Sequence, residues 1–116
     1  MNDVLQEKSF KFALRVVKLS EFLNDEKREF VLSKKILDSG TNIGLLIEEG
    51  KQGENRSDFR QKYSVANKEA FKTNFLLRLL HKSDLIGEAL ANSLLEDCIE
   101  LQKMLVATLK TIGKAE

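Results

Sequence analysis

The residues of this sequence that most resemble a phosphate-binding loop are Gly40, Gly44 and Gly50, followed by Lys51. In a Walker phosphate loop, four residues separate the two glycines, and a Ser or Thr after the lysine holds magnesium. Here five residues separate Gly44 from Gly50, two of them are glutamates, and Gln52 follows the lysine. The preceding residues also have a helical rather than a strand-like pattern. The sequence therefore predicts no nucleotide site at this stretch.

Metal and catalytic chemistry needs clusters of His, Cys and carboxylate side chains, and this chain has one histidine, His81, and one cysteine, Cys98. A di-iron site in a helical bundle needs paired Glu-x-x-His motifs, which a single histidine cannot supply. Without a Cys-x-x-Cys pair or a catalytic partner, Cys98 is expected to be a small buried apolar residue. His81 is expected near a helix end, partly exposed, in a capping role. We expect no catalytic residues, no metal, no cofactor and no small-molecule substrate, so the protein is predicted not to be an enzyme.

Basic residues between positions 56 and 82 are the remaining candidates for a binding function. At about 100° per residue, five of them fall within roughly a third of a helix circumference; they are Arg60, Lys68, Lys72, Arg78 and Lys82. Such a stripe can follow a phosphate backbone, in RNA or DNA. A solvated face with ion pairs within and between subunits explains the same pattern, and both interpretations stay open.

Charge is distributed unevenly along the chain. Nineteen Lys and Arg against eighteen Asp and Glu give a net charge of +1. Residues 51–82 hold eight basic and three acidic side chains, a net +5, whereas residues 83–116 hold three basic and six acidic ones, a net −3. This asymmetry can favour an anionic partner or a neighbouring subunit.

The 116 residues, 42% hydrophobic and 32% charged, are typical of one soluble globular domain. The single cysteine excludes an internal disulfide. The first residues show no signal-peptide pattern, and no apolar run is long enough to span a bilayer. We expect a cytoplasmic protein with no membrane partner.

The elements that position these residues are predicted to be helices. The chain contains no proline, and its turn residues cluster at Asn24-Asp25, at 50–57 and at 83–87. Four segments rich in Leu, Lys and Glu remain, and short connections make neighbouring helices antiparallel. We predict one all-α domain over residues 1–116, an antiparallel up-and-down four-helix bundle with helices at roughly 4–23, 26–49, 56–82 and 88–113.

The predicted helix ends have candidate caps. Asn24 or Asp25 can cap the second helix, and Asn55 or Ser57 the third. Gly50 and Gly53 suit the end of the second helix, because glycine tolerates the left-handed conformation common there. Within that helix, Gly40 and Gly44 lie one turn apart, which predicts a close helix crossing, with a functional kink as the alternative.

Apolar periodicity gives the third and fourth segments a heptad seam each. The third segment has the seam Phe59, Tyr63, Ala66, Ala70, Thr73, Leu77 and Leu80, and the fourth has Leu90, Leu94, Cys98, Leu101, Leu105, Thr108 and Ile112.

The first and third segments also hold apolar residues that do not fit a single buried seam. In the first segment, one stripe holds Phe12, Val16, Leu19 and Leu23, and a roughly opposite stripe holds Phe10, Ala13, Leu14 and Val17. In the third segment they are Phe71, Phe75, Leu76 and Leu79. This excess predicts self-association; wide buried faces in a small bundle are the alternative.

Three stretches together resemble a known family: SFKFALRVVKLSEFL, SGTNIGLLIEEG and SDFRQKYSVANKEAFKTNFLLRLL. The chain resembles the four-helix-bundle proteins encoded in intervening sequences of bacterial large-subunit ribosomal RNA genes. That family is related to the accessory variability determinants of diversity-generating retroelements, which form pentamers and bind nucleic acid and a reverse transcriptase. The resemblance implies a four-helix bundle, a homopentamer and no known enzymatic activity.

The family's most specific motif has the form R-S-x-x-S-I-x-x-N-I-x-E-G at the end of the second helix. Here Ser39, Ile43, Ile47, Glu49 and Gly50 match it, and Glu69 fits the family's pattern in the third helix together with Asp58, Phe59 and Ala66. Asp38, Asn42 and Leu46 stand where the family tends to have Arg, Ser and Asn. These departures keep the apolar frame, but Asp38 removes a positive charge where an RNA contact would want one.

Two hypotheses of function follow. The first is a non-enzymatic, homo-oligomeric bundle that binds RNA or other nucleic acid weakly and without strong sequence preference. The alternative is a protein-protein interaction scaffold without nucleic-acid binding, in which the second apolar faces and the charge asymmetry serve assembly and partner docking.

Overall fold

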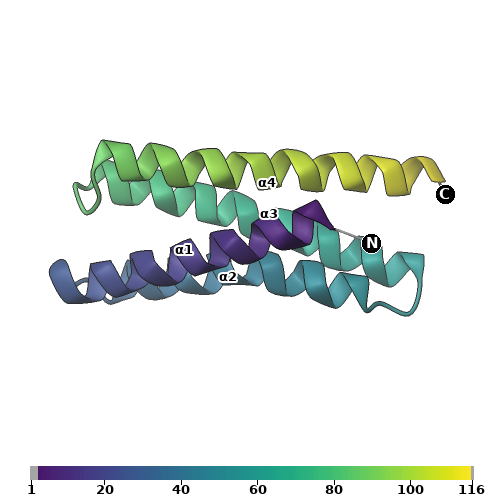
Figure 1. Cartoon of the computed structure of the whole chain (residues 1–116), viewed down its shortest axis with the longest axis horizontal. Coiled ribbons are helices and arrows are strands. Elements are labelled where there is room, and N and C mark those ends of the chain that lie inside the picture. Colours follow the sequence, from purple (N-terminus) through teal and green to yellow (C-terminus); the bar gives the residue numbers. More distant parts are fainter. Residues whose placement is uncertain (1–2, 116) are drawn as a thin grey trace.

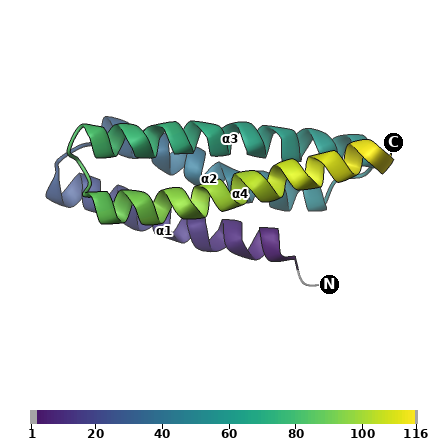
Figure 2. The same cartoon turned by 90° about the horizontal axis from the view of Figure 1, so that it is seen from above.

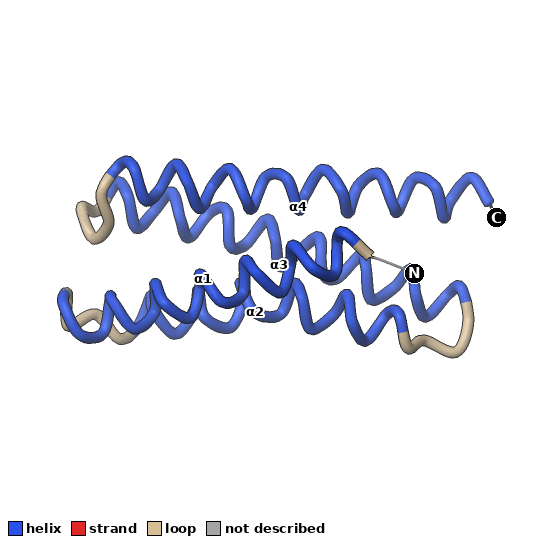
Figure 3. Tube along the Cα trace, viewed as in Figure 1, coloured by secondary structure: helices blue, strands red, loops and turns tan. Residues whose placement is uncertain are grey.

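The computed structural model describes residues 3–115, with side chains described for residues 3–113. The chain forms four α-helices, α1 (Val4–Glu26), α2 (Val31–Lys51), α3 (Arg56–Lys82) and α4 (Glu88–Ala115). They run alternately up and down in one elongated bundle of 47 × 23 × 20 Å (Figures 1 and 2). Short loops join them at the two ends (Figure 3). The predicted all-α, up-and-down bundle is therefore confirmed; of the predicted domain, residues 1, 2 and 116 lie outside the described residues.

The connection between α1 and α2 lies later in the chain than predicted. Asn24 and Asp25 belong to α1, which ends at Glu26, and α2 begins at Val31 instead of residue 26. Phe30 holds the N-cap position without a side-chain bond, and the carboxylate of Glu29 before it accepts hydrogen bonds from the amides of Leu32 and Ser33 at 3.1 and 2.9 Å. The Asn24 side chain also links the two helices, because its oxygen accepts a hydrogen bond from the Ser33 hydroxyl at 2.8 Å. Neither Asn24 nor Asp25 therefore has the predicted role.

The other helix starts follow the sequence more closely. Asp3 caps α1 by accepting from the Gln6 amide at 3.0 Å, and Asn55 caps α3 by accepting from the Asp58 amide at 2.9 Å. Of the two candidates for α3, Asn55 is thus the cap and Ser57 lies inside the helix.

No described glycine has a positive φ, so Gly50 and Gly53 do not supply the predicted left-handed turn. That conformation is taken by Arg28 and Asp84 instead. Packing explains why position 50 is a glycine, because a Cβ there would lie 2.8 Å from the Tyr63 ring.

Close packing of α1 on α2 explains the two central glycines. A Cβ at Gly40 would lie 2.7 and 2.8 Å from the two methyl groups of Val16. Gly44 faces Ser9, whose carbonyl oxygen would be 3.4 Å from an added Cβ. The predicted close helix crossing is therefore present, and Gly40 is where it is tightest.

The core runs along the inside of all four helices and follows most of the two predicted seams, of which Phe59 and Thr108 are only half-buried. Leu76 was predicted to lie off the seam of α3 but is buried. Leu90 was predicted on the seam of α4 but is exposed, and Ala91 is buried instead. On α1, the Phe12, Val16, Leu19 and Leu23 stripe is the buried one.

Polar bonds bridge the contact between α1 and α4, which is the smallest of the four helix–helix contacts. Arg15 donates to the Asp97 carboxylate at 2.7 Å and to the Ser93 hydroxyl at 3.0 Å. Lys8 pairs with Glu100 at 3.2 Å. Within the described part of the chain, no helix is both long enough and apolar enough to span a membrane.

Candidate nucleic-acid interface

The outer face of α3 carries all five basic residues predicted to bind nucleic acid. Arg60, Lys68, Lys72, Arg78 and Lys82 are exposed. α3 packs against α2 and α4 and leaves its remaining side open along its whole length (Figures 1 and 2). The helix therefore presents the five cations on one elongated surface.

Their charges are neutralised to different degrees. Lys72 pairs with the mostly buried Glu69 at 2.9 Å. Arg78 donates to the Asn74 side-chain oxygen at 2.9 Å, and its guanidinium lies 5.6 Å from the centre of the Phe75 ring. Among the described side chains, Lys68 and Lys82 have no ion-pair partner. The surface therefore keeps net positive charge.

Three exposed apolar side chains lie on the same face, interleaved with the cations. Phe71 and Phe75 are 58% and 55% exposed, and Leu79 lies one turn further along. At 100° per residue, these three residues fall within the sector that holds the five basic side chains. We call the combined surface, Phe71, Phe75 and Leu79 with Arg60, Lys68, Lys72, Arg78 and Lys82, the α3 face.

This combination was not predicted from the sequence. The aromatic residues indicated self-association and the basic residues indicated nucleic-acid binding, although both sets share one helical sector. The signal was in the spacing: Phe71 and Phe75 are one turn apart, and Lys72 and Arg78 follow them directly or within one turn.

The residues of the family motif lie inside the bundle or at its polar contacts. Ile43 and Ile47 are fully buried, and Glu49 pairs with Lys62 of α3 at 3.4 Å. The Ser39 and Thr73 hydroxyls lie 2.9 Å apart, and Thr73 also donates to the Glu69 carbonyl oxygen at 2.8 Å.

The three departures from the motif lie on α2 in different surroundings. Asn42 lies 3.5 Å from the Glu69 carboxylate, Leu46 packs against the core, and Asp38 is exposed. The motif therefore joins α2 to α3, and no motif residue belongs to the α3 face.

The two residues most suited to catalysis are Cys98 and His81, and Cys98 lies in an unreactive setting. Cys98 is fully buried, and its sulfur donates to the Ala70 carbonyl oxygen at 3.3 Å. Burial, together with the charge of Asp97, raises the pKa of the Cys98 thiol to about 12. His81 is half-buried in the last turn of α3, as the sequence suggested. Within the described residues, no group of three His, Cys, Asp or Glu side chains could hold a metal ion.

A second apolar surface lies on α1. Phe10, Leu14 and Val17 are exposed and point away from the core, as the second stripe of the sequence predicted. We call these three residues the α1 stripe. Because α1 and α3 do not pack against each other, the α1 stripe and the α3 face lie on opposite sides of the bundle.

These features define an all-α four-helix bundle with a basic and aromatic outer face. The family model described as 23S rRNA-intervening sequence protein matches residues 2–107. The chain belongs to this family. It is also similar to a crystal structure of a protein with unknown function from the S23 ribosomal protein family of Bacteroides thetaiotaomicron. The two share 42% sequence identity with a TM-score of 0.91, over 92% of this chain and 99% of that one.

A comparison with curated proteins gave no match. Neither the description of the family nor that of the similar structure indicates an enzyme.

Proposed function

We propose that this protein is a non-enzymatic, self-associating bundle that binds single-stranded RNA through the α3 face. The observation that supports this most is the interleaving of Phe71 and Phe75 with cations on one exposed helix side. Single-stranded nucleic acid is bound without strong sequence preference where a basic surface follows the phosphates and aromatic rings stack on the bases. The α3 face supplies both kinds of group.

Two further parts of the proposal concern the state of the protein in the cell. Copies of the chain meet through the α1 stripe, in the homopentamer that the family resemblance implies. The bundle works in the cytoplasm without a cofactor or a small-molecule substrate, which fits a single buried cysteine with a raised thiol pKa.

The binding test uses an unstructured RNA of about twelve nucleotides, which is within the range that one single-strand binding domain covers. Fluorescence anisotropy at several salt concentrations between about 50 and 200 mM gives the affinity and its salt slope. We expect the affinity to fall steeply with salt. Absence of binding at the lowest salt, or an affinity indifferent to salt, would overturn the proposal.

Charge-matched variants locate the binding surface. Lys68→Gln with Lys82→Gln removes two cations from the α3 face, and Lys34→Gln with Lys35→Gln removes two exposed cations from α2. If both α3 lysines contact phosphates, the first pair lowers the salt slope by roughly 1.4, because each phosphate contact on a single strand contributes about 0.7. The α2 pair should leave the slope nearly unchanged.

The interaction-scaffold hypothesis rests on the α1 stripe, an exposed apolar surface whose flanking lysines, Lys11 and Lys18, are paired with glutamates of the same helix. A pull-down from nuclease-treated lysate tests it, with the wild-type chain against the Phe10→Gln, Leu14→Gln variant as bait. A protein partner lost with this variant would support the scaffold, and recovery of no partner would count against it.

A further inference from the structure

A cavity of about 390 Å³ lies at the end of the bundle where α2 turns into α3. It exists because α1 begins short of this end, so that the last turns of α4 have no α1 beside them (Figures 1 and 2). Gly50 and Gly53 line it from the α2 end, Phe59 from α3, and Ile112 from α4. We call this space the end cavity.

An aromatic side chain lines the end cavity. One face of the Phe59 ring stacks on Tyr63, with ring centres 4.3 Å apart and an interplanar angle of 21°. Phe59 nevertheless lines the cavity and is only half-buried. Because stacked rings favour an offset parallel arrangement, a further flat ring can continue the pair on the Phe59 side.

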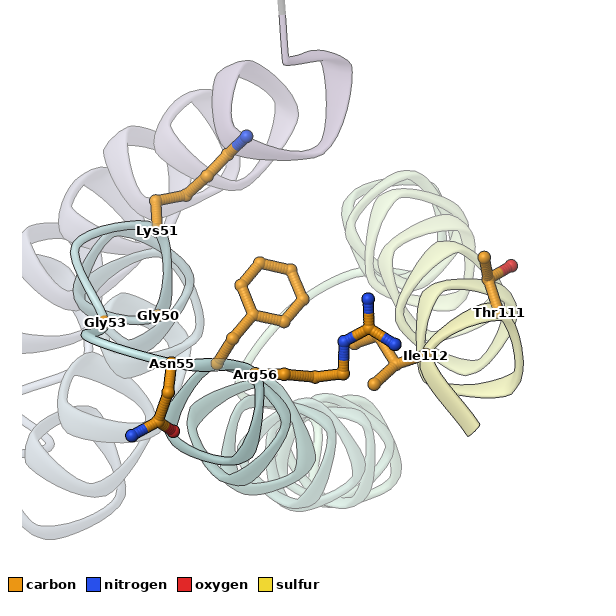
Figure 4. A pocket seen from close by; sticks show the side chains of 8 residues that line it. Gly50, Lys51, Gly53, Asn55, Arg56, Thr111 and Ile112 are labelled. Carbon is orange, nitrogen blue, oxygen red and sulfur yellow. The ribbon is translucent and has the colours of Figure 1, made fainter. Parts of the chain in front are cut away.

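A cation lies at the edge of the same space. Figure 4 shows Arg56 extending from α3 across to Ile112 of α4, whereas Lys51 and Asn55 point away from the cavity. Lys51 is paired with Asp3, and Asn55 is occupied as the cap of α3. Within the described residues no carboxylate pairs with Arg56, including Asp58, which packs against Gly53. The Arg56 guanidinium is therefore available to an anion.

Arg56 stands between the end cavity, which it lines, and the α3 face. Arg56 lies one turn before Arg60, and both stand on the side of α3 that leads to Phe71. The distance along the helix axis from residue 56 to residue 71 is about 22 Å. A strand lying on the α3 face could therefore place one end at the cavity.

We propose that the end cavity binds a single nucleotide, with the base stacked on Phe59 and the phosphate at Arg56. The ligand is the terminal nucleotide of a strand on the α3 face or a free mononucleotide, since both carry the same base and phosphate. This inference rests on the proposed function only for the strand-bound form.

The test compares two variants of the cavity with two matched controls. Phe59→Leu keeps the apolar volume and removes the ring face, and Arg56→Gln removes the cation. The controls are Phe30→Leu and Arg28→Gln, which change exposed residues at the opposite end of the bundle. Circular dichroism and thermal melting check that each variant is folded. Arg56 is exposed on the first turn of α3, so Arg56→Gln keeps the proposal testable even if Phe59→Leu does not fold.

We expect Phe59→Leu to weaken binding of the short RNA about tenfold, since stacking of one base on an aromatic side chain has an effect of this order. Arg56→Gln should weaken it and lower the salt slope by roughly 0.7. In NMR spectra, the added RNA should give nuclear Overhauser contacts between a base and the Phe59 ring, and neither control variant should change the affinity.

The outcomes separate this inference from the proposed function. RNA binding that is lost in the α3-face lysine variant but unchanged in Phe59→Leu and Arg56→Gln would overturn the end cavity and leave the α3 face standing. If no RNA binds, NMR titration with AMP and with UMP tests whether the end cavity binds a free mononucleotide. Shifts of the Gly53 and Ile112 amides that vanish in both cavity variants support a free-mononucleotide site, whereas no shifts at millimolar nucleotide overturn it.

Discussion

Gly40 and Gly44 stand one turn apart on the α2 surface that faces α1, yet they differ in how much space surrounds them. A Cβ at Gly40 would come within 2.8 Å of both Val16 methyls and 3.2 Å of the Val16 Cβ, so rotation of that side chain offers no relief. At Gly44 the nearest atoms are 3.4 Å away. The same substitution should therefore have different effects at the two positions.

We expect Gly40→Ala to lower the free energy of unfolding by about 1 kcal/mol or more, because overpacking outweighs the gain in helix propensity. Gly44→Ala should leave it unchanged or raise it by up to about 1 kcal/mol. Urea denaturation of both variants measures the difference. Equal stability of the two variants would show that the helix crossing at Val16 is looser than described.

The Cys98 thiol should be unreactive in the folded protein. Its pKa of about 12, raised by burial and by the charge of Asp97, leaves almost no thiolate at pH 8. A disulfide reagent such as Ellman's reagent should therefore label Cys98 only at the rate at which the protein opens, and rapidly in denaturant. Fast labelling of the native protein would contradict the burial of this residue.

At the residue scale, the sequence predicted the burial of Cys98 but not that of Leu76 or the exposure of Leu90. A heptad seam describes a helix with one partner, whereas α3 packs against both α2 and α4 and buries a wider arc that includes Leu76. Leu90 faces the side of α4 towards α1, where a cavity of about 330 Å³ lined by Arg15 and Phe22 leaves it exposed.

At the scale of the elements, capping decides where α2 begins. Polar residues at 24 and 25 predicted a turn, but the Glu29 carboxylate, just before α2, accepts the bonds from the first helix amides. The pattern did not predict Glu29, because Ser, Thr, Asp and Asn dominate capping. The α3 start was predicted correctly because Asn55 is such a residue. The helix of the α3 face was thus predictable, and the spacing of its aromatic and basic residues already places both sets in one helical sector. The structure adds that this sector is exposed.

The start of α1 makes a testable contribution to pH dependence. Burial alone would raise the pKa of Asp3, but bonds from Lys51 and the Gln6 amide outweigh it and lower the pKa below the ordinary value of 3.8. A lowered native pKa stabilises the fold above pH 3.8, and this stabilisation is lost as the pH falls through the native pKa.

We expect Asp3→Asn to reduce stability at pH 7 by less than about 1 kcal/mol, since Asn still caps the helix and the lost ion pair is partly exposed. The difference in stability between the variant and the wild type should disappear below pH 3.8. Thermal melts of both proteins between pH 7 and pH 2.5 measure this difference. A difference that does not change with pH would mean that the charge of Asp3 contributes nothing to stability.

At the scale of the whole molecule, the α1 stripe and the α3 face lie on two helices that are not neighbours in the bundle. In the proposed assembly through the α1 stripe, the α3 face of every copy would stay open to RNA. Linked copies would then bind a long RNA at several points, and the second contact would have a high effective concentration. Assembly and RNA binding are thus expected to cooperate for long RNA and to be independent for short RNA.

The Phe10→Gln, Leu14→Gln variant tests this relation, because it removes two exposed apolar side chains of the α1 stripe. Light scattering should report a homo-oligomer for the wild type at micromolar concentration and a monomer for the variant. Its affinity for the twelve-nucleotide RNA should match the wild type, whereas its affinity for an RNA several times longer should fall about a hundredfold, since avidity is lost.

Val31→Gln with Leu45→Gln is the matched control, because both residues are exposed apolar side chains of α2. This control should keep the oligomer and both affinities. A monomeric wild type would refute self-association altogether. If the α1 variant stays oligomeric and Phe71→Gln with Phe75→Gln gives the monomer, the copies meet through the α3 face instead. In that case RNA would compete with assembly, and adding RNA should dissociate the wild-type oligomer.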